Sequence, residues 1–157
     1  FRLATGPTEG LTDEFLHAAS TSGHELEAAI EVVLKGPELQ LPKGLSYADK
    51  DGHVRHRMRT RWFASPRHQT YRSFALTAAD AIPDYPLPES LPEGGYKQEE
   101  RPVFFGHYWM RADKPSILAP NVACLDYSVA KGGMLVAYRW KGEKTLSNQN
   151  FETVKSH

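Results

Sequence analysis

A histidine at the end of an apolar run is the first candidate for chemistry. His107 follows Pro102–Phe105 and the single residue Gly106. A histidine placed just after a glycine, where a buried strand ends, can present a ring nitrogen at the edge of the sheet, as a metal ligand must. We therefore take His107 as a candidate metal ligand. The alternative is an aromatic strand end with a histidine satisfied by its neighbours, and the Gly-His pair by itself favours this alternative because short motifs are unspecific.

Four arginines form a second candidate site, for binding phosphate. They alternate along the chain as Arg55, Arg57, Arg59 and Arg61. A strand would place all four on one face at intervals of roughly 7 Å, and guanidinium groups bind phosphate in bidentate fashion. The other face, with Met58 and Trp62, suits a core. The alternative is a solvent-exposed face neutralised by the acidic segment 80–100, and the weak specificity of exposed ion pairs favours it.

The last third of the chain carries a longer ordered pattern. It consists of Pro102–Trp109 (Pro-Val-Phe-Phe-Gly-His-Tyr-Trp), Asn121–Gly133, Leu135–Trp140 and Gly142–Glu143. Three further segments belong to it upstream: Leu34–Glu38, Asp49–Gly52 and Arg59–Trp62. Over residues 26–154 this pattern resembles the ending of bacterial calcineurin-like metallophosphoesterases, a group that includes serine/threonine phosphatase-like and diadenosine-polyphosphatase-like enzymes.

The resemblance implies a hydrolase that cleaves phosphate esters with a water activated by two divalent metal ions, Mn, Fe or Zn. In that family the ligands come from a D-x-H, a G-D-x-x-D-R-G, a G-N-H-E, a later lone His and a final Gly-His. Only the final Gly-His carries over, onto Gly106 and His107, and the chain contains no G-D-x-x-D and no G-N-H-E. A literal D-x-H occurs at Asp51–His53, where Asp-Gly predicts a hairpin turn instead of a ligand.

The resemblance therefore implies that residues 1–157 are the carboxy-terminal portion of a metallophosphoesterase domain. Residues 1–100 would form a helical and hairpin insert or cap-like region, and residues 101–157 the carboxy-terminal sheet of the calcineurin-like α/β sandwich. We expect the other ligands to precede Phe1 and this chain by itself to be inactive. The alternative function is a non-catalytic binding module that recognises an anionic partner through the arginine-rich strand.

Residues near Cys124 supply two further candidates. Asp126 and Tyr127 follow an apolar pair and could orient the metal-bound histidine, since ligating imidazoles usually donate their other N–H to an acceptor. The single cysteine, Cys124, excludes an internal disulfide and is expected to pack as a small hydrophobic residue. The remaining histidines show no spacing that suggests a shared metal, and we interpret them as surface residues; they are His17, His24, His56, His68 and His157.

Hydrophobic periodicity predicts the elements that position these residues. As an isolated chain the protein is predicted to be α+β, with two amino-terminal helices, a long hairpin and a carboxy-terminal antiparallel meander. The helices span 13–22 and 24–35, and the hairpin joins 45–47 to 53–63 through a turn at 49–52. A short strand at 71–75, a Pro-rich acidic loop at 80–100, a strand at 102–109 and a meander of 121–127, 134–140 and 151–154 follow, with Leu125, Val136 and Tyr138 in packing positions.

Composition limits the partners. The chain has 157 residues, of which 40% are hydrophobic, and its 19 basic and 19 acidic residues give a net charge of zero. This balance removes the electrostatic argument for a nucleic-acid or membrane-surface partner. The opening residues lack the apolar run of a signal peptide or a membrane span. The single cysteine fits a reducing compartment, so a cytoplasmic protein is expected. The expected partners are a phosphorylated substrate, the missing amino-terminal part of the same polypeptide and, through an exposed apolar sheet, a second copy.

Overall fold

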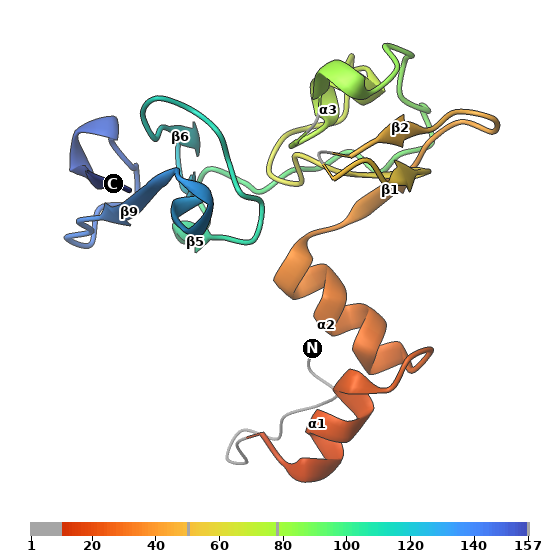
Figure 1. Ribbon diagram of the computed structural model, residues 1–157, viewed down its shortest axis with the longest axis horizontal. Helices are drawn as coiled ribbons and strands as arrows, with labels where there is room; N and C mark the ends of the chain where they lie inside the picture. Colours follow the sequence, from red (N-terminus) through yellow and green to blue (C-terminus); the bar gives the residue numbers. More distant parts are fainter. Residues whose placement is uncertain (1–10, 50, 78, 157) are drawn as a thin grey trace. The chain divides into compact units, whose positions relative to one another are not determined.

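The computed structural model describes residues 11–49, 51–77 and 79–156 and mixes helices with strands, as the α+β class predicts (Figure 1). It divides into two compact units, Phe1–Glu38 and Leu39–His157. The longest helix has 11 residues. None of the helices in the described ranges has the length and apolar character needed to cross a bilayer.

The first unit contains the two predicted helices, α1 (Asp13–Ser20) and α2 (Glu25–Lys35). The Thr12 hydroxyl caps α1 by accepting a hydrogen bond from the backbone N–H of Phe15 at 3.2 Å, as its residue type predicts. His24 caps α2, because its Nδ1 accepts the N–H of Leu26 at 3.1 Å. α1 ends two residues earlier than expected, and the Thr21 hydroxyl donates back to a carbonyl of the last turn. Both helices are thus encoded by local signals.

The predicted long hairpin is wrong in one respect, because its second arm belongs to two sheets. The four strands are β1 (Glu38–Gln40), β2 (Tyr47–Ala48), β3 (Val54–Arg55) and β4 (Arg57–Arg59). β3 pairs with β2, whereas β4 pairs with β1. The change occurs at His56, whose carbonyl accepts the N–H of Leu41 at 2.8 Å and the side-chain amide of Gln40 at 2.9 Å. The predicted turn is confirmed, since Gly52 N–H donates to the Asp49 carbonyl at 2.9 Å.

A short helix, α3 (Tyr71–Phe74), replaces the strand predicted at 71–75. The Thr70 hydroxyl accepts the N–H of Ser73 at 3.1 Å, and the Ser73 hydroxyl accepts the N–H of Thr70 at 2.9 Å. This reciprocal capping box stabilises a helical turn in a segment whose composition suggested a strand. Tyr71 and Phe74 then lie on one face, within a core cluster completed by Leu41, Met58, Ala75 and Ile82.

The acidic segment 80–100 is a loop, as predicted. The short helix η1 (Ala79–Ala81) begins this loop. Among the described residues of the loop, strand-like pairing is limited to Pro86, which forms an isolated bridge with Thr70. The loop packs closely on the chain near Phe63, because a Cβ at Gly95 would lie 2.9 Å from the Phe63 carbonyl oxygen. Gly95 also has φ +119, which other residues rarely adopt.

The last third of the chain forms two three-stranded sheets. The first, in the order β5-β7-β6, contains β5 (Val103–Phe105), β6 (Ile117–Ala119) and β7 (Val122–Cys124). The second, in the order β10-β9-β8, contains β8 (Asp126–Tyr127), β9 (Met134–Tyr138) and β10 (Phe151–Lys155). Short helices η2 (Val129–Lys131) and η3 (Asn148–Asn150) connect the strands of the second sheet.

These sheets correct three strand predictions. The strand expected at 102–109 ends at Phe105, and it runs parallel to β7. The strand expected at 121–127 breaks at Leu125, whose N–H donates to the Phe105 carbonyl at 2.8 Å and so stays in the first sheet. The meander therefore contains only β8, β9 and β10, which are antiparallel to their neighbours. β6 lies in a stretch for which no strand was predicted.

Packing in this part follows the predicted apolar positions. Val136 is buried with Tyr127 and Met134, and Leu125 packs against them. Tyr138 is half-buried between the rings of Phe104 and Phe151. Cys124 is fully buried, as expected of a small hydrophobic residue. The opposite face keeps apolar side chains in solvent, since the cross-strand pair Leu135 and Val154 is 58% and 62% exposed. Self-association through this face stays a prediction.

Candidate functional site

His107 lies in a short loop at the carboxyl end of β5, residues 106–111, which we call the β5 loop. The side chain is exposed, and its backbone is left-handed with φ 77. Trp109, two residues later, is also left-handed with φ 51. Residues other than glycine adopt this region rarely and at a cost of about 1–3 kcal/mol, and such residues cluster at functional sites. The loop is therefore held by contacts elsewhere.

Asp126, at the start of β8, supplies those contacts. Its Oδ2 accepts the backbone N–H of Trp109 at 3.2 Å, and its carbonyl accepts the N–H of Met110 at 2.9 Å. Its Oδ1 accepts the N–H of Ser128 at 3.1 Å. In this structure the carboxylate therefore orders the backbone that follows His107. The predicted role of Asp126 beside a metal-bound imidazole stays a prediction.

The Tyr127 side chain takes part in a different set of contacts. It belongs to the core cluster with Met134 and Val136, and its hydroxyl accepts the N–H of Ser116 at 3.2 Å. Burial raises the pKa of the Tyr127 phenol. The phenol is therefore protonated at neutral pH. A role for it in orienting His107 is likewise a prediction.

Aromatic rings surround the β5 loop. Tyr108 contacts the Phe105 ring edge-on at a centroid distance of 5.3 Å and the His107 ring at 5.9 Å. The Nζ of Lys131 lies 3.9 Å from the centroid of the Trp109 ring. Burial raises the pKa of Tyr108, and the positive charge of Arg59 opposes that shift. The Tyr108 phenol is thus a neutral hydrogen-bond donor near neutral pH.

The residues of the β5 loop could supply one ligand of a metal site, the imidazole of His107. His107 is exposed and could offer a ring nitrogen to a cation. Within residues 11–49, 51–77 and 79–156, no group of three or more His, Cys, Asp or Glu side chains is placed to hold a metal ion. Other histidines have local roles: His24 caps α2, and the Nδ1 of His56 lies 3.3 Å from the Leu45 carbonyl oxygen. A dinuclear centre on His107 would need ligands from beyond this described set.

The four predicted arginines do not share one strand. Arg55 is in β3, Arg57 and Arg59 are in β4, and Arg61 follows β4. Arg55 pairs with Asp49 at 2.7 Å, the Nε of Arg57 donates to Gln40 at 3.2 Å, and Arg61 lies over the Phe63 ring at 5.6 Å. The single-strand arrangement is therefore wrong, because the change of sheet at His56 interrupts it. Substrate binding by these arginines stays a prediction.

A cleft of about 660 Å³ begins one residue after His107. We call it the β5-loop cleft. The lining residues from the loop are Tyr108, Trp109, Met110 and Arg111, and those from the preceding segments are Tyr47, Ala48, Asp49, Leu76, Thr77, Asp80 and Ala81. The sequence interpretation missed Arg111, although its position four residues after His107 was a signal that could have identified it.

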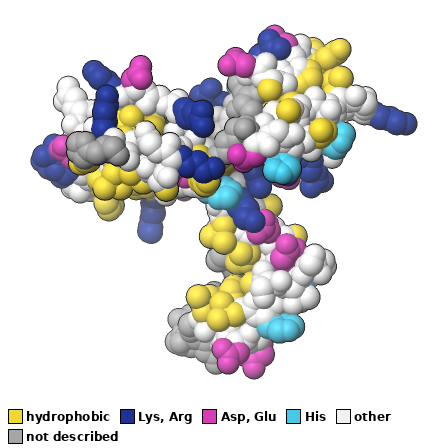
Figure 2. Space-filling view, viewed as in Figure 1, with side chains coloured by type: hydrophobic (Ala, Val, Ile, Leu, Met, Phe, Trp, Pro, Cys, Tyr) yellow, Lys and Arg dark blue, Asp and Glu magenta, His cyan; other side chains and the backbone are white. Residues whose placement is uncertain are grey.

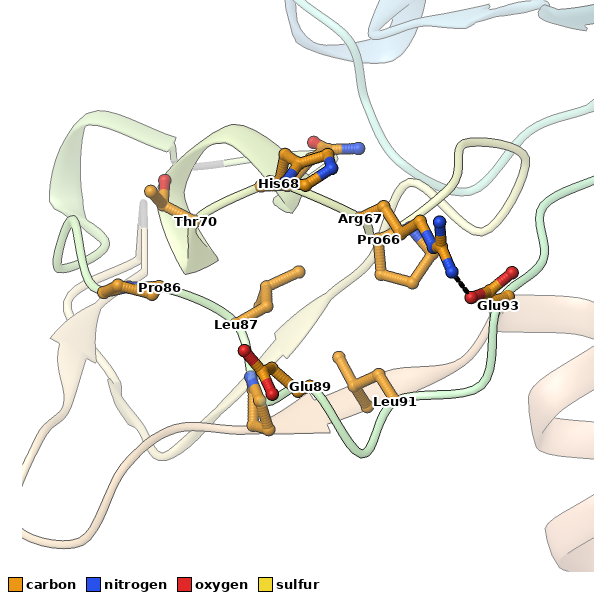
Figure 3. Close-up of a pocket in the computed structure, with 11 residues that line it drawn as sticks. Pro66, Arg67, His68, Thr70, Pro86, Leu87, Glu89, Leu91 and Glu93 are labelled. Carbon is orange, nitrogen blue, oxygen red and sulfur yellow. Dashed lines mark ion pairs between the residues drawn. The ribbon is translucent and has the colours of Figure 1, made fainter.

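A second cleft of about 700 Å³ lies between the segment before α3 and the Pro-rich loop (Figure 3). His68 and Leu87 line it, and an ion pair between Arg67 and Glu93 lies at one end. The side chains that line this second cleft are a mixture of apolar and charged groups, and they do not form a cluster of hydrogen-bond donors. The β5-loop cleft is the better candidate, because the four residues that follow His107 in the chain line it.

No family model matches the chain, and comparisons with curated proteins and with solved structures likewise find no match.

Proposed function

We propose that this chain is the carboxy-terminal part of a metal-dependent phosphoesterase, in which His107 supplies one metal ligand. The observation that carries the proposal is the placement of His107. It is an exposed imidazole at the carboxyl end of β5, one strand of a parallel pair, in a left-handed conformation. Sites for ligands and metals are common at the carboxyl ends of parallel strands. The sequence pattern over residues 26–154, which resembles calcineurin-like metallophosphoesterases, supports the same conclusion.

The residues of this chain have definite tasks in the proposed enzyme. His107 would offer a ring nitrogen to the metal. Asp126 fixes the loop that carries His107, because its carboxylate accepts the backbone N–H of Trp109 and its carbonyl accepts the N–H of Met110. The metal ions, when bound, lower the pKa of a water molecule and neutralise charge on the phosphoryl oxygens. The remaining ligands would come from a part of the polypeptide outside these 157 residues, so hydrolysis is a property of the complete polypeptide.

The alternative, an anion-binding module built on the arginine-rich segment, has less support. Arg55 is neutralised by Asp49, and Arg61 packs on Phe63. A phosphate-binding face needs guanidinium groups that point together. The change of sheet at His56 leaves only Arg57 and Arg59 in the same strand, β4.

The experiment compares the product of the complete gene with its His107→Ala variant. We expect hydrolysis of p-nitrophenyl phosphate in the presence of Mn²⁺, and a loss of about 100-fold or more in the variant, since even outer partners of metal ligands cost about 10–100-fold. His17→Ala, on the exposed surface of α1, is the control and should retain activity. Metal content measured by mass spectrometry should fall in His107→Ala alone. Full activity and full metal content in His107→Ala would contradict the proposal.

A further inference from the structure

We propose that the β5-loop cleft binds phosphate monoesters that carry an aromatic group, with Arg111 contacting the phosphate and three aromatic side chains contacting the ring. The inference rests on the proposed function, because it names the substrate class for a cleft that is lined by the residues following His107 in the β5 loop. The cleft volume of about 660 Å³ lies within the range of small-molecule sites, roughly 300–1,000 Å³.

The aromatic walls select for a planar group. Tyr47, Tyr108 and Trp109 all line the cleft, together with the apolar side chains of Leu76 and Met110. Tyr108 packs edge-on against Phe105, and the Lys131 ammonium lies over the Trp109 ring. Rings that are already ordered contact a ligand ring at little entropic cost, and aromatic pairs add about 0.5–1.5 kcal/mol beyond the area that they bury. An alkyl phosphate would gain less binding free energy from contact with the same aromatic side chains.

Arg111 supplies the positive charge at the cleft. Its side chain is exposed, and within the described part of the chain it forms no hydrogen bond or ion pair. Arg55, by contrast, is held by Asp49. A guanidinium group offers two parallel donors that match a phosphate.

Two carboxylates also line the cleft, and they make the inference testable. Asp49 is engaged: its Oδ1 accepts the N–H groups of Asp51 and His53, and its Oδ2 pairs with Arg55. Asp80 is exposed and forms no ion pair among the described residues. A ligand with a dianionic phosphate should therefore bind less tightly because of Asp80 and more tightly because of Arg111, so the two residues should have opposite effects.

The experiment is isothermal titration calorimetry on the 157-residue chain in EDTA, where metal-dependent hydrolysis cannot occur. The probes are phenyl phosphate and 2-glycerol phosphate, which share the phosphate and differ in the organic group. We expect phenyl phosphate to bind about three- to tenfold more tightly. Arg111→Met should weaken its binding about fivefold or more, Asp80→Asn should strengthen it, and the exposed control Arg101→Met should change nothing. Circular dichroism checks that each variant is folded.

Equal affinity for the two probes, or equal binding by Arg111→Met and Arg101→Met, would overturn the inference. Its failure is distinguishable from failure of the proposed function. Binding of phenyl phosphate without any hydrolysis by the complete gene product would contradict the phosphoesterase and leave the cleft intact. Hydrolysis that depends on His107 but shows no aromatic preference would contradict the cleft and leave the phosphoesterase intact.

Discussion

Asp126 Oδ2 accepts a hydrogen bond from the backbone N–H of Trp109 at 3.2 Å, and this bond ties the start of β8 to the loop that carries His107. The two residues are 17 positions apart in the chain. The loop contains two left-handed residues, His107 and Trp109. Its conformation is therefore maintained by a contact from a different sheet and not by its own sequence.

Asp126→Ala should lower the free energy of unfolding by about 1–3 kcal/mol, because the N–H groups of Trp109 and Ser128 lose a charged acceptor. Urea denaturation followed by circular dichroism measures the change. Asp113→Ala, at an exposed position, is the control. Equal stability of the two variants would show that the carboxylate does not hold the loop.

Gly133→Ala should be among the most destabilising single substitutions in the chain. A Cβ at this position would lie 2.0 Å from the Tyr127 carbonyl oxygen and 2.8 Å from that of Ser128, so the backbone between β8 and β9 must move. We expect a loss of about 3 kcal/mol or more, as for other severe overpacking. Gly94→Ala meets nothing within 4 Å and has no positive φ, so it should be nearly neutral in the same urea experiment.

The turn at Asp49 should make stability depend on pH. Burial by itself raises the pKa of Asp49, but hydrogen bonds from His53, Arg55 and Asp51, together with the charge of Arg55, outweigh it and lower the pKa from 3.8 to about 2. A carboxyl group whose pKa is lower in the folded chain stabilises the fold above its unfolded pKa. This contribution is lost as the pH falls from about 4 towards 2.

Asp49→Asn should therefore be less stable than the wild type at pH 7 and closer to it at pH 2.5. Urea midpoints measured at both pH values and at pH 4 test this expectation. If the difference in urea midpoint between Asp49→Asn and the wild type did not narrow in acid, the lowered pKa of Asp49 would be refuted.

Cys124 should resist alkylation in the folded protein. Its side chain is fully buried, and burial raises the pKa of the thiol to about 11, while the hydrogen bond to the Asp126 carbonyl at 3.8 Å opposes the shift only in part. The thiolate is the reactive form, so iodoacetamide at pH 8 should modify the native chain slowly and the urea-unfolded chain rapidly. Mass spectrometry at timed intervals gives both rates. Equal rates would show that the strand β7 opens readily.

Local signals in the sequence were sufficient for the elements whose hydrogen bonds are themselves local. The Thr12 hydroxyl caps the start of α1, and Gly36, with φ 70, ends α2. Asp49–Gly52 predicted a turn, and the pattern in 134–140 and 151–154 predicted two strands of the meander, which the structure forms as β9 and β10. In each case the residues that determine the backbone conformation lie within a few positions of one another.

Strand partners and the candidate site were decided by tertiary structure. An alternating pattern gives each side chain a face but does not choose the neighbouring strand, so it could not show that the chain changes sheets at His56 and at Leu125. The sequence identified His107 by its place after an apolar run. It could not show that Asp126 fixes the following loop, or that Arg111 lines a cleft with Tyr47, because these contacts join residues far apart in the chain and exist only once the sheets have formed.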